Sequence, residues 1–159
     1  MDEAVAEKIN AAFCEVLNRQ VFLFADPVPQ GEFDAGEGAF QAATIGFRGE
    51  VEGRITMALP DSIVGEIAAN FLGMDADDPF VTAKSGDACK ELLNVACGHI
   101  LTALKGDGPV FDLSIPELSA VDARRVGDWA TGAGALPFDV DGSPVLLRIH
   151  WGPPDPENP

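Results

Sequence analysis

The stretch from Ser85 to Leu104, SGDACKELLNVACGHILTAL, constrains the fold most because it has the pattern of a long amphipathic helix. At about 100° of rotation per residue, its apolar residues fall on one half of the helix. These are Cys89, Leu92, Leu93, Ala96, Cys97, Ile100 and Leu104. The opposite side carries a single stripe formed by Asp87, Glu91, Asn94 and Gly98. We therefore expect a buried face that packs on a core, and an exposed polar stripe that folding alone does not explain.

Periodicity and turn residues predict the other elements. Helices are expected over residues 2–20, from Pro60 to a stop at Gly73, and over 82–104. Strands are expected over residues 21–24, 40–47, 51–59, 110–113, 117–122, 134–140 and 144–151. Asp141-Gly142 indicates a tight hairpin between the last two strands. Because the strands form hairpins without a repeated βαβ order, the sequence predicts an α+β fold with long helices packed on an antiparallel β-sheet.

The chain length of 159 residues suits one domain with one core. We expect residues 1–151 to form that single domain. Residues 152–159, GPPDPENP, are rich in proline and are expected to be a disordered tail.

The net charge of −16 excludes two classes of partner. A nucleic-acid backbone and an anionic membrane surface would both repel so acidic a chain. No apolar run reaches the roughly 18 residues of a membrane span, and the acidic start MDEAVAEKIN is unlike a signal peptide. These features predict a cytoplasmic protein.

The cysteines and histidines do not predict a metal or redox site. Three cysteines cannot all pair within one chain, and we expect Cys14, Cys89 and Cys97 to be buried reduced thiols. His99 and His150 are isolated from other ligands at metal-binding spacing. The acidic segment 75–78 begins like a calcium loop, but it meets Pro79 and lacks the glycine and the terminal glutamate of an EF-hand.

The run from Lys90 to Gly98, KELLNVACG, resembles the signature helix of the CheC/CheX/FliY chemotaxis phosphatases. The family pattern is Asp or Ser, three residues, Glu, two residues, Asn, about twenty-two residues and Pro. This chain supplies Asp87, Glu91, Asn94 and Pro116, with the final gap one residue short. A preceding strand pair of the type Phe47-x-Gly49-x-x-x-Gly53 also fits, and so does Gly98. The resemblance covers residues 39–121, and the single motif helix is most similar to CheX.

The resemblance implies hydrolysis of the aspartyl phosphate on a CheY-like receiver domain of two-component signalling. Asn94 would orient the attacking water and Glu91 would dock against the receiver's active-site lysine. Asp87, Val95 and Gly98 would contact the partner, with the role of Asp87 left open between this contact and support of the first helical turns. Magnesium would belong to the receiver, and no cofactor would be bound by this chain. A homodimer is also expected by resemblance.

Three alternatives stay open. Glu15 and Asn18 repeat the Glu-x-x-Asn spacing and form a candidate second site, although Ala11 occupies the Asp or Ser position and no glycine follows four residues after Asn18. The chain could instead be a noncatalytic adaptor that binds a receiver or another signalling protein. An enzyme acting on a small acyl phosphate is the weakest alternative, because the sequence shows no basic phosphate-binding cluster.

Overall fold

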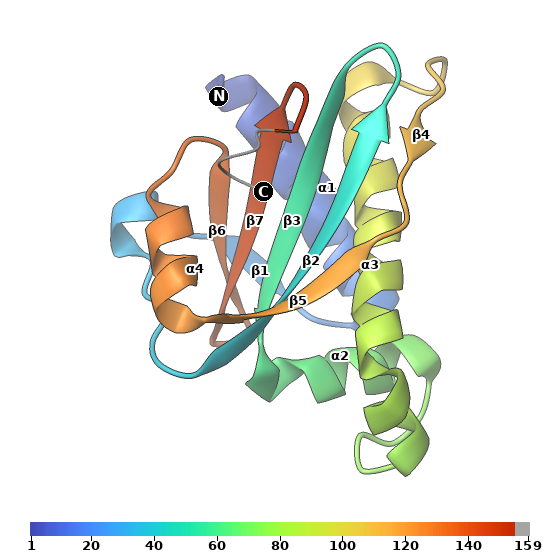
Figure 1. Cartoon of the computed structure of the whole chain (residues 1–159), viewed down its shortest axis with the longest axis vertical. Coiled ribbons are helices and arrows are strands. Elements are labelled where there is room, and N and C mark those ends of the chain that lie inside the picture. The colour runs from blue at the N-terminus through green and yellow to red at the C-terminus, as the bar shows by residue number, and fades with distance from the viewer. Residues whose placement is uncertain (155–159) are drawn as a thin grey trace.

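A seven-stranded antiparallel sheet organises the computed structural model, which describes residues 1–154 (Figure 1). The helices within this range are α1 (Glu3–Val21), α2 (Asp61–Leu72), α3 (Pro79–Lys105) and α4 (Ala123–Ala130), with a 3-10 turn η1 (Gln30–Glu32). The strands are β1 (Ala25–Pro27), β2 (Ala39–Arg48), β3 (Glu52–Pro60), β4 (Asp112–Leu113), β5 (Glu117–Asp122), β6 (Ala135–Val140) and β7 (Ser143–Trp151). Their order is β1-β6-β7-β3-β2-β4, and β5 also pairs with β2. The predicted α+β class is confirmed.

The main core lies between α1, α2, α3 and one face of the sheet. Alternate residues of the central strands, such as Ile45, Ile55 and Leu147, point into it and are at most 1% exposed. Phe13 of α1 packs against Phe138 of β6 in a tilted arrangement, with 4.8 Å between ring centroids. The opposite face carries a smaller apolar cluster under α4, so α4 and α1 lie on opposite sides of the sheet (Figure 1).

Capping residues explain where α3 begins and ends. The Asp78 carboxylate accepts a hydrogen bond from the Phe80 amide at 2.9 Å, and Pro79 occupies the first helical position. The helix therefore starts three residues before the predicted residue 82 and runs for 27 residues. Gly106 ends it with a backbone conformation at φ +79° that favours glycine.

The hairpin at Asp141-Gly142 has the expected geometry. Both residues have positive φ, +47° and +87°, as a type I′ turn requires. The Asp139 carboxylate accepts a hydrogen bond from the Gly142 amide at 2.9 Å, which fixes the turn between β6 and β7. The register that follows pairs Val140 with Ser143.

One prediction about local structure is wrong, and one helix was not foreseen. Residues 21–24 do not form a strand, because α1 continues through Val21 and Phe22 ends it in a left-handed conformation; the strand is Ala25–Pro27, which pairs with β6. Helix α4 was not predicted at all. It is only eight residues long, and its buried residues are Ala123, Val126 and Ala130.

The predicted disordered tail falls largely beyond the described residues. Residues 155–159 lie outside them, so that part stays a prediction. At the start of this segment the Gly152 amide donates a hydrogen bond to the Glu52 carbonyl at 2.8 Å. Within residues 1–154, no helix combines the length and apolar character needed to cross a membrane.

Burial of two cysteines predicts a loss of stability at alkaline pH. Desolvation raises the pKa of Cys89 to about 11 and that of Cys97 to about 12, from an ordinary value of 9.0. The folded state therefore keeps both thiols protonated where the unfolded chain ionises. Their contribution is fully present below pH 9 and is lost as the pH rises towards 12. Urea unfolding between pH 8 and 11 (roughly the window in which unfolded thiols titrate) should show this decline.

The control for this prediction is the variant carrying both Cys89→Ala and Cys97→Ala. It lacks the two buried thiols but keeps every lysine, so the alkaline decline in its free energy of unfolding should be shallower. An equally steep decline in the variant would show that other groups cause it.

Candidate functional site

The residues Asp87, Glu91, Asn94 and Gly98, named here the α3 polar stripe, lie on the side of α3 away from the main core. Asp87 and Glu91 are exposed, and Asn94 and Gly98 are half-buried. The opposite side of the helix is fully buried at Cys89, Leu92, Leu93, Ala96, Cys97 and Ile100, each 0% exposed. The predicted division of the helix into a core face and a polar stripe is therefore confirmed. The apolar face fixes the rotation of α3 and so decides which residues reach solvent.

The carboxylate of Asp87 has partners within the helix. Lys84 Nζ lies 3.7 Å and Lys90 Nζ 3.5 Å from its oxygens. A helix N-terminus stabilises an acidic group only within about the first turn. Asp87 lies beyond that turn, because α3 begins at Pro79. Support of the first turns is thus excluded for Asp87, which leaves its lysine pairs and contact with a partner.

Glu91 and Asn94 differ from Asp87 because their side chains have no interaction partner among the described residues. Among residues 1–154, neither side chain makes a hydrogen bond or an ion pair. They are three residues apart on one helix face, so one ligand surface can reach both. The site therefore offers an exposed acceptor and an amide that both donates and accepts.

Val95 and Gly98 contribute shape to the site. Val95 is half-buried and packs against the main core, so only part of its side chain is left for a partner, less than the sequence led us to expect. A Cβ atom built on Gly98 would meet nothing within 4 Å. Gly98 is therefore open towards solvent, and internal packing does not require a glycine at this position.

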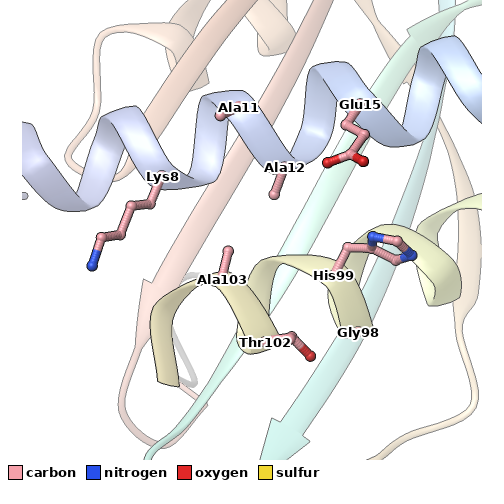
Figure 2. Close-up of a pocket in the computed structure, with 8 residues that line it drawn as sticks. All are labelled: Lys8, Ala11, Ala12, Glu15, Gly98, His99, Thr102 and Ala103. Atoms are coloured by element: carbon pink, nitrogen blue, oxygen red, sulfur yellow. The ribbon is translucent and has the colours of Figure 1, made fainter. Parts of the chain in front are cut away.

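Gly98 opens into a groove between α1 and α3 (Figure 2). The groove has a volume of about 580 Å³. Its lining is Lys8, Ala11, Ala12 and Glu15 from α1, and Gly98, His99, Thr102 and Ala103 from α3. The sequence did not single out Lys8 or Thr102 as site residues. Only the spacing of Thr102, four residues after Gly98, could have indicated that the exposed face of α3 continues there.

The candidate second site on α1 is brought beside α3 but is organised differently. Glu15 and Asn18 are both exposed. The Glu15 carboxylate pairs with Arg19 at 3.0 Å, whereas Glu91 has no such partner among the described residues. Glu15 lines the groove that Gly98 opens, and Asn18 does not. The two residues therefore do not reproduce the arrangement at Glu91 and Asn94.

Two glycines of the β2–β3 hairpin are required by close packing. A Cβ on Gly49 would lie 2.7 Å from both the Phe111 ring and the Val110 carbonyl oxygen. A Cβ on Gly53 would collide with the His150 carbonyl oxygen and approach the Phe47 ring to 2.7 Å. These contacts explain the glycines of the strand-pair pattern as structural residues.

The remaining candidates from the sequence have structural surroundings. Pro116 is half-buried and immediately precedes β5. His150 is exposed at the end of β7, where its Nε2 lies 3.3 Å from the Pro153 carbonyl oxygen. The described part of the chain contains no group of three or more His, Cys, Asp or Glu residues placed to hold a metal ion.

Comparison with solved structures places this fold among known proteins. A CheX from Desulfovibrio desulfuricans has a TM-score of 0.69 at 17% identity, over 94% of this chain and 99% of that chain. CheX in a CheX-CheY-BeF3-Mg+2 complex from Borrelia burgdorferi has a TM-score of 0.62 at 21% identity, over 92% and 97%. FliY from Thermotoga maritima has a TM-score of 0.56 at 12% identity, over 96% and 92%.

This chain therefore shares its fold, helices packed on an antiparallel sheet, with CheX and FliY proteins. The family model for chemotaxis phosphatase CheX matches residues 41–127, which is more than half of the chain. The chain belongs to the CheX family. No curated protein sequence matched it.

Proposed function

We propose that this chain is a phosphatase that hydrolyses the aspartyl phosphate of a CheY-like receiver domain. The observation that carries the proposal is the α3 polar stripe, in which Glu91 and Asn94 are accessible and have no partner within residues 1–154. Membership of the CheX family supports it. The Borrelia burgdorferi CheX was solved in a complex with CheY, which supports a receiver as the partner.

The chemistry needs little from this chain beyond the placement of one water molecule. Phosphoryl transfer proceeds with the attacking and leaving oxygens roughly in line, so catalysis comes mainly from positioning. The Asn94 amide can accept a hydrogen bond from that water with its oxygen and donate one with its nitrogen. Half-burial on a packed helix restricts the Asn94 side chain, which favours such positioning.

The other residues of the α3 polar stripe would bind the receiver. The exposed Glu91 carboxylate would accept a charge-assisted hydrogen bond from the receiver's active-site lysine. Asp87, Gly98 and the exposed part of Val95 would contact the surrounding receiver surface. In this proposal magnesium belongs to the receiver, and this chain binds no cofactor. A homodimer is also proposed, and light scattering would measure it.

Turnover of a phosphorylated receiver tests the proposal directly. A substoichiometric amount of this chain should accelerate loss of the phosphoryl group from a CheY-like receiver of the same organism, with each molecule acting many times. Binding of the phosphorylated receiver without acceleration would contradict the phosphatase proposal and would identify a noncatalytic adaptor.

Replacing Glu91 tests docking separately from chemistry. Glu91→Ala should weaken binding of the phosphorylated receiver by roughly tenfold or more, because a hydrogen bond between charged groups contributes about 1.5–3 kcal/mol. Glu66→Ala, which removes an exposed glutamate from α2, is the matched control and should bind as the wild type does. Equal affinity for the Glu91→Ala and Glu66→Ala proteins would exclude the docking role.

A further inference from the structure

Three of the six arginines of this acidic chain line one cleft on the sheet face opposite α1, α2 and α3. They are Arg54 from β3, Arg125 from α4 and Arg148 from β7. The cleft has a volume of about 670 Å³, within the usual range for a small-molecule site. We expected no basic cluster from the sequence. The structure corrects that expectation because it brings together residues that are far apart in the chain.

Strand register explains how this cleft forms. Thr56 of β3 pairs with Arg148 of β7 on one side and with Thr44 of β2 on the other. Paired residues share a sheet face, and Arg54, two residues before Thr56, lies on the same face. The Thr44 and Thr56 hydroxyls are 2.9 Å apart. The sheet therefore supplies two arginines and two hydroxyls on one surface.

Helix α4 adds an aromatic wall and the third arginine. The guanidinium carbon of Arg125 lies 5.4 Å from the centre of the Trp129 ring, and that of Arg148 lies 5.1 Å from it. Both distances are within the range of a cation–π contact. Trp129 thus holds two like charges close together.

The arginines are held near one another at an electrostatic cost. Burial lowers the pKa of Arg148, and the nearby charges of Arg54 and Arg125 lower it further. Two carboxylates also line the cleft, those of Glu117 and Asp122. The Asp122 carboxylate already accepts a hydrogen bond from the Arg125 backbone amide at 2.8 Å, where it caps α4.

We propose that this cleft binds a small molecule carrying two or more oxyanion groups, either phosphates or carboxylates. Guanidinium groups bind both kinds of oxyanion through paired hydrogen bonds, and the threonine hydroxyls add further donors. A bound anion would offset the repulsion between Arg125 and Arg148. The site is separate from the α3 polar stripe, because the cleft and α3 lie on opposite faces of the sheet.

Tryptophan fluorescence can report on this cleft alone. The chain has two tryptophans and no tyrosine, so Trp151→Phe leaves Trp129 as the single strong fluorophore. Titration of this protein with inorganic pyrophosphate, and separately with citrate, should give a saturable change in fluorescence. Sodium chloride at matched ionic strength should give none, and the anion with the lower Kd identifies phosphate or carboxylate as the preferred group.

Arg125 lines the cleft and its sequence neighbour Arg124 does not, so these two residues give a matched pair of variants. In the Trp151→Phe background, Arg125→Gln and Arg148→Gln should each weaken anion binding by about tenfold or more. Arg124→Gln removes an equal charge from the adjacent position of α4, which does not line the cleft, and should leave the Kd unchanged. A response that does not saturate, or an equal loss in all three variants, would overturn the proposal. Circular dichroism establishes that each variant is folded.

Discussion

Asn94→Ala should slow receiver dephosphorylation by about two orders of magnitude or more, the effect of removing a group that positions the reacting water. The truncated side chain has no described hydrogen-bond partner in the protein, so its loss breaks no internal interaction. Stability should change by no more than about 0.5 kcal/mol, as for other substitutions outside the core. The decay of the phosphorylated receiver measures the first effect, and urea unfolding measures the second.

The chain offers a matched control for this substitution in its other Glu-x-x-Asn pair. Asn18→Ala removes the same amide from an exposed position of α1, where Glu15 is paired with Arg19. We expect this variant to keep wild-type activity. Loss of dephosphorylation activity in Asn18→Ala but not in Asn94→Ala would place the catalytic site on α1. Wild-type activity in a folded Asn94→Ala protein would show that Asn94 does not orient the water.

The α3 polar stripe could be predicted because it depends on one continuous helix. Helical geometry alone relates Asp87, Glu91 and Asn94 once the apolar side of the segment is known. The same local reasoning located the hairpin at Asp141-Gly142, where turn chemistry determines the register. Such features need no knowledge of how distant segments pack.

The groove and the arginine cleft could not be predicted in this way. Glu15 and Gly98 come together only because α1 packs beside α3, and Arg54 meets Arg148 only through the pairing of β3 with β7. Alternation along β3 could have placed Arg54 and Thr56 on one sheet face, but not opposite a particular strand. Helix α4 was missed because its eight residues are fewer than the roughly 11–18 residues over which helical periodicity is recognised.

The end of α1 shows how packing overrides local pattern. Residues 21–24 form a short run of apolar residues that suits a strand, yet Val21 is fully buried as the last residue of α1. The Asn70 side-chain amide donates a hydrogen bond to the Val21 carbonyl at 2.7 Å, so α2 satisfies a group that α1 leaves open at its end. Asn70 and Val21 are far apart in the sequence, so a local sequence pattern does not reveal this contact.

Phe13→Ala should lower the free energy of unfolding by about 3–5 kcal/mol, the usual cost of removing a large buried aromatic side chain. Phe13 is 0% exposed, and its ring lies 4.8 Å from that of Phe138, so it joins α1 to the sheet at β6. A loss of this size is a large part of the roughly 5–15 kcal/mol that stabilises a domain. The midpoint of urea unfolding, compared at equal slope, measures it.

Phe24→Ala is the matched control, because it removes the same side chain from a position that is 66% exposed. It should cost less than about 0.5 kcal/mol. Because α1 packs beside α3, a destabilised α1 should also reduce receiver dephosphorylation at temperatures where part of the Phe13→Ala protein is unfolded. At lower temperature, where the variant stays folded, its activity should return, whereas the activity of Asn94→Ala should not. Similar losses of stability for Phe13→Ala and Phe24→Ala would contradict the place given to Phe13 in the core.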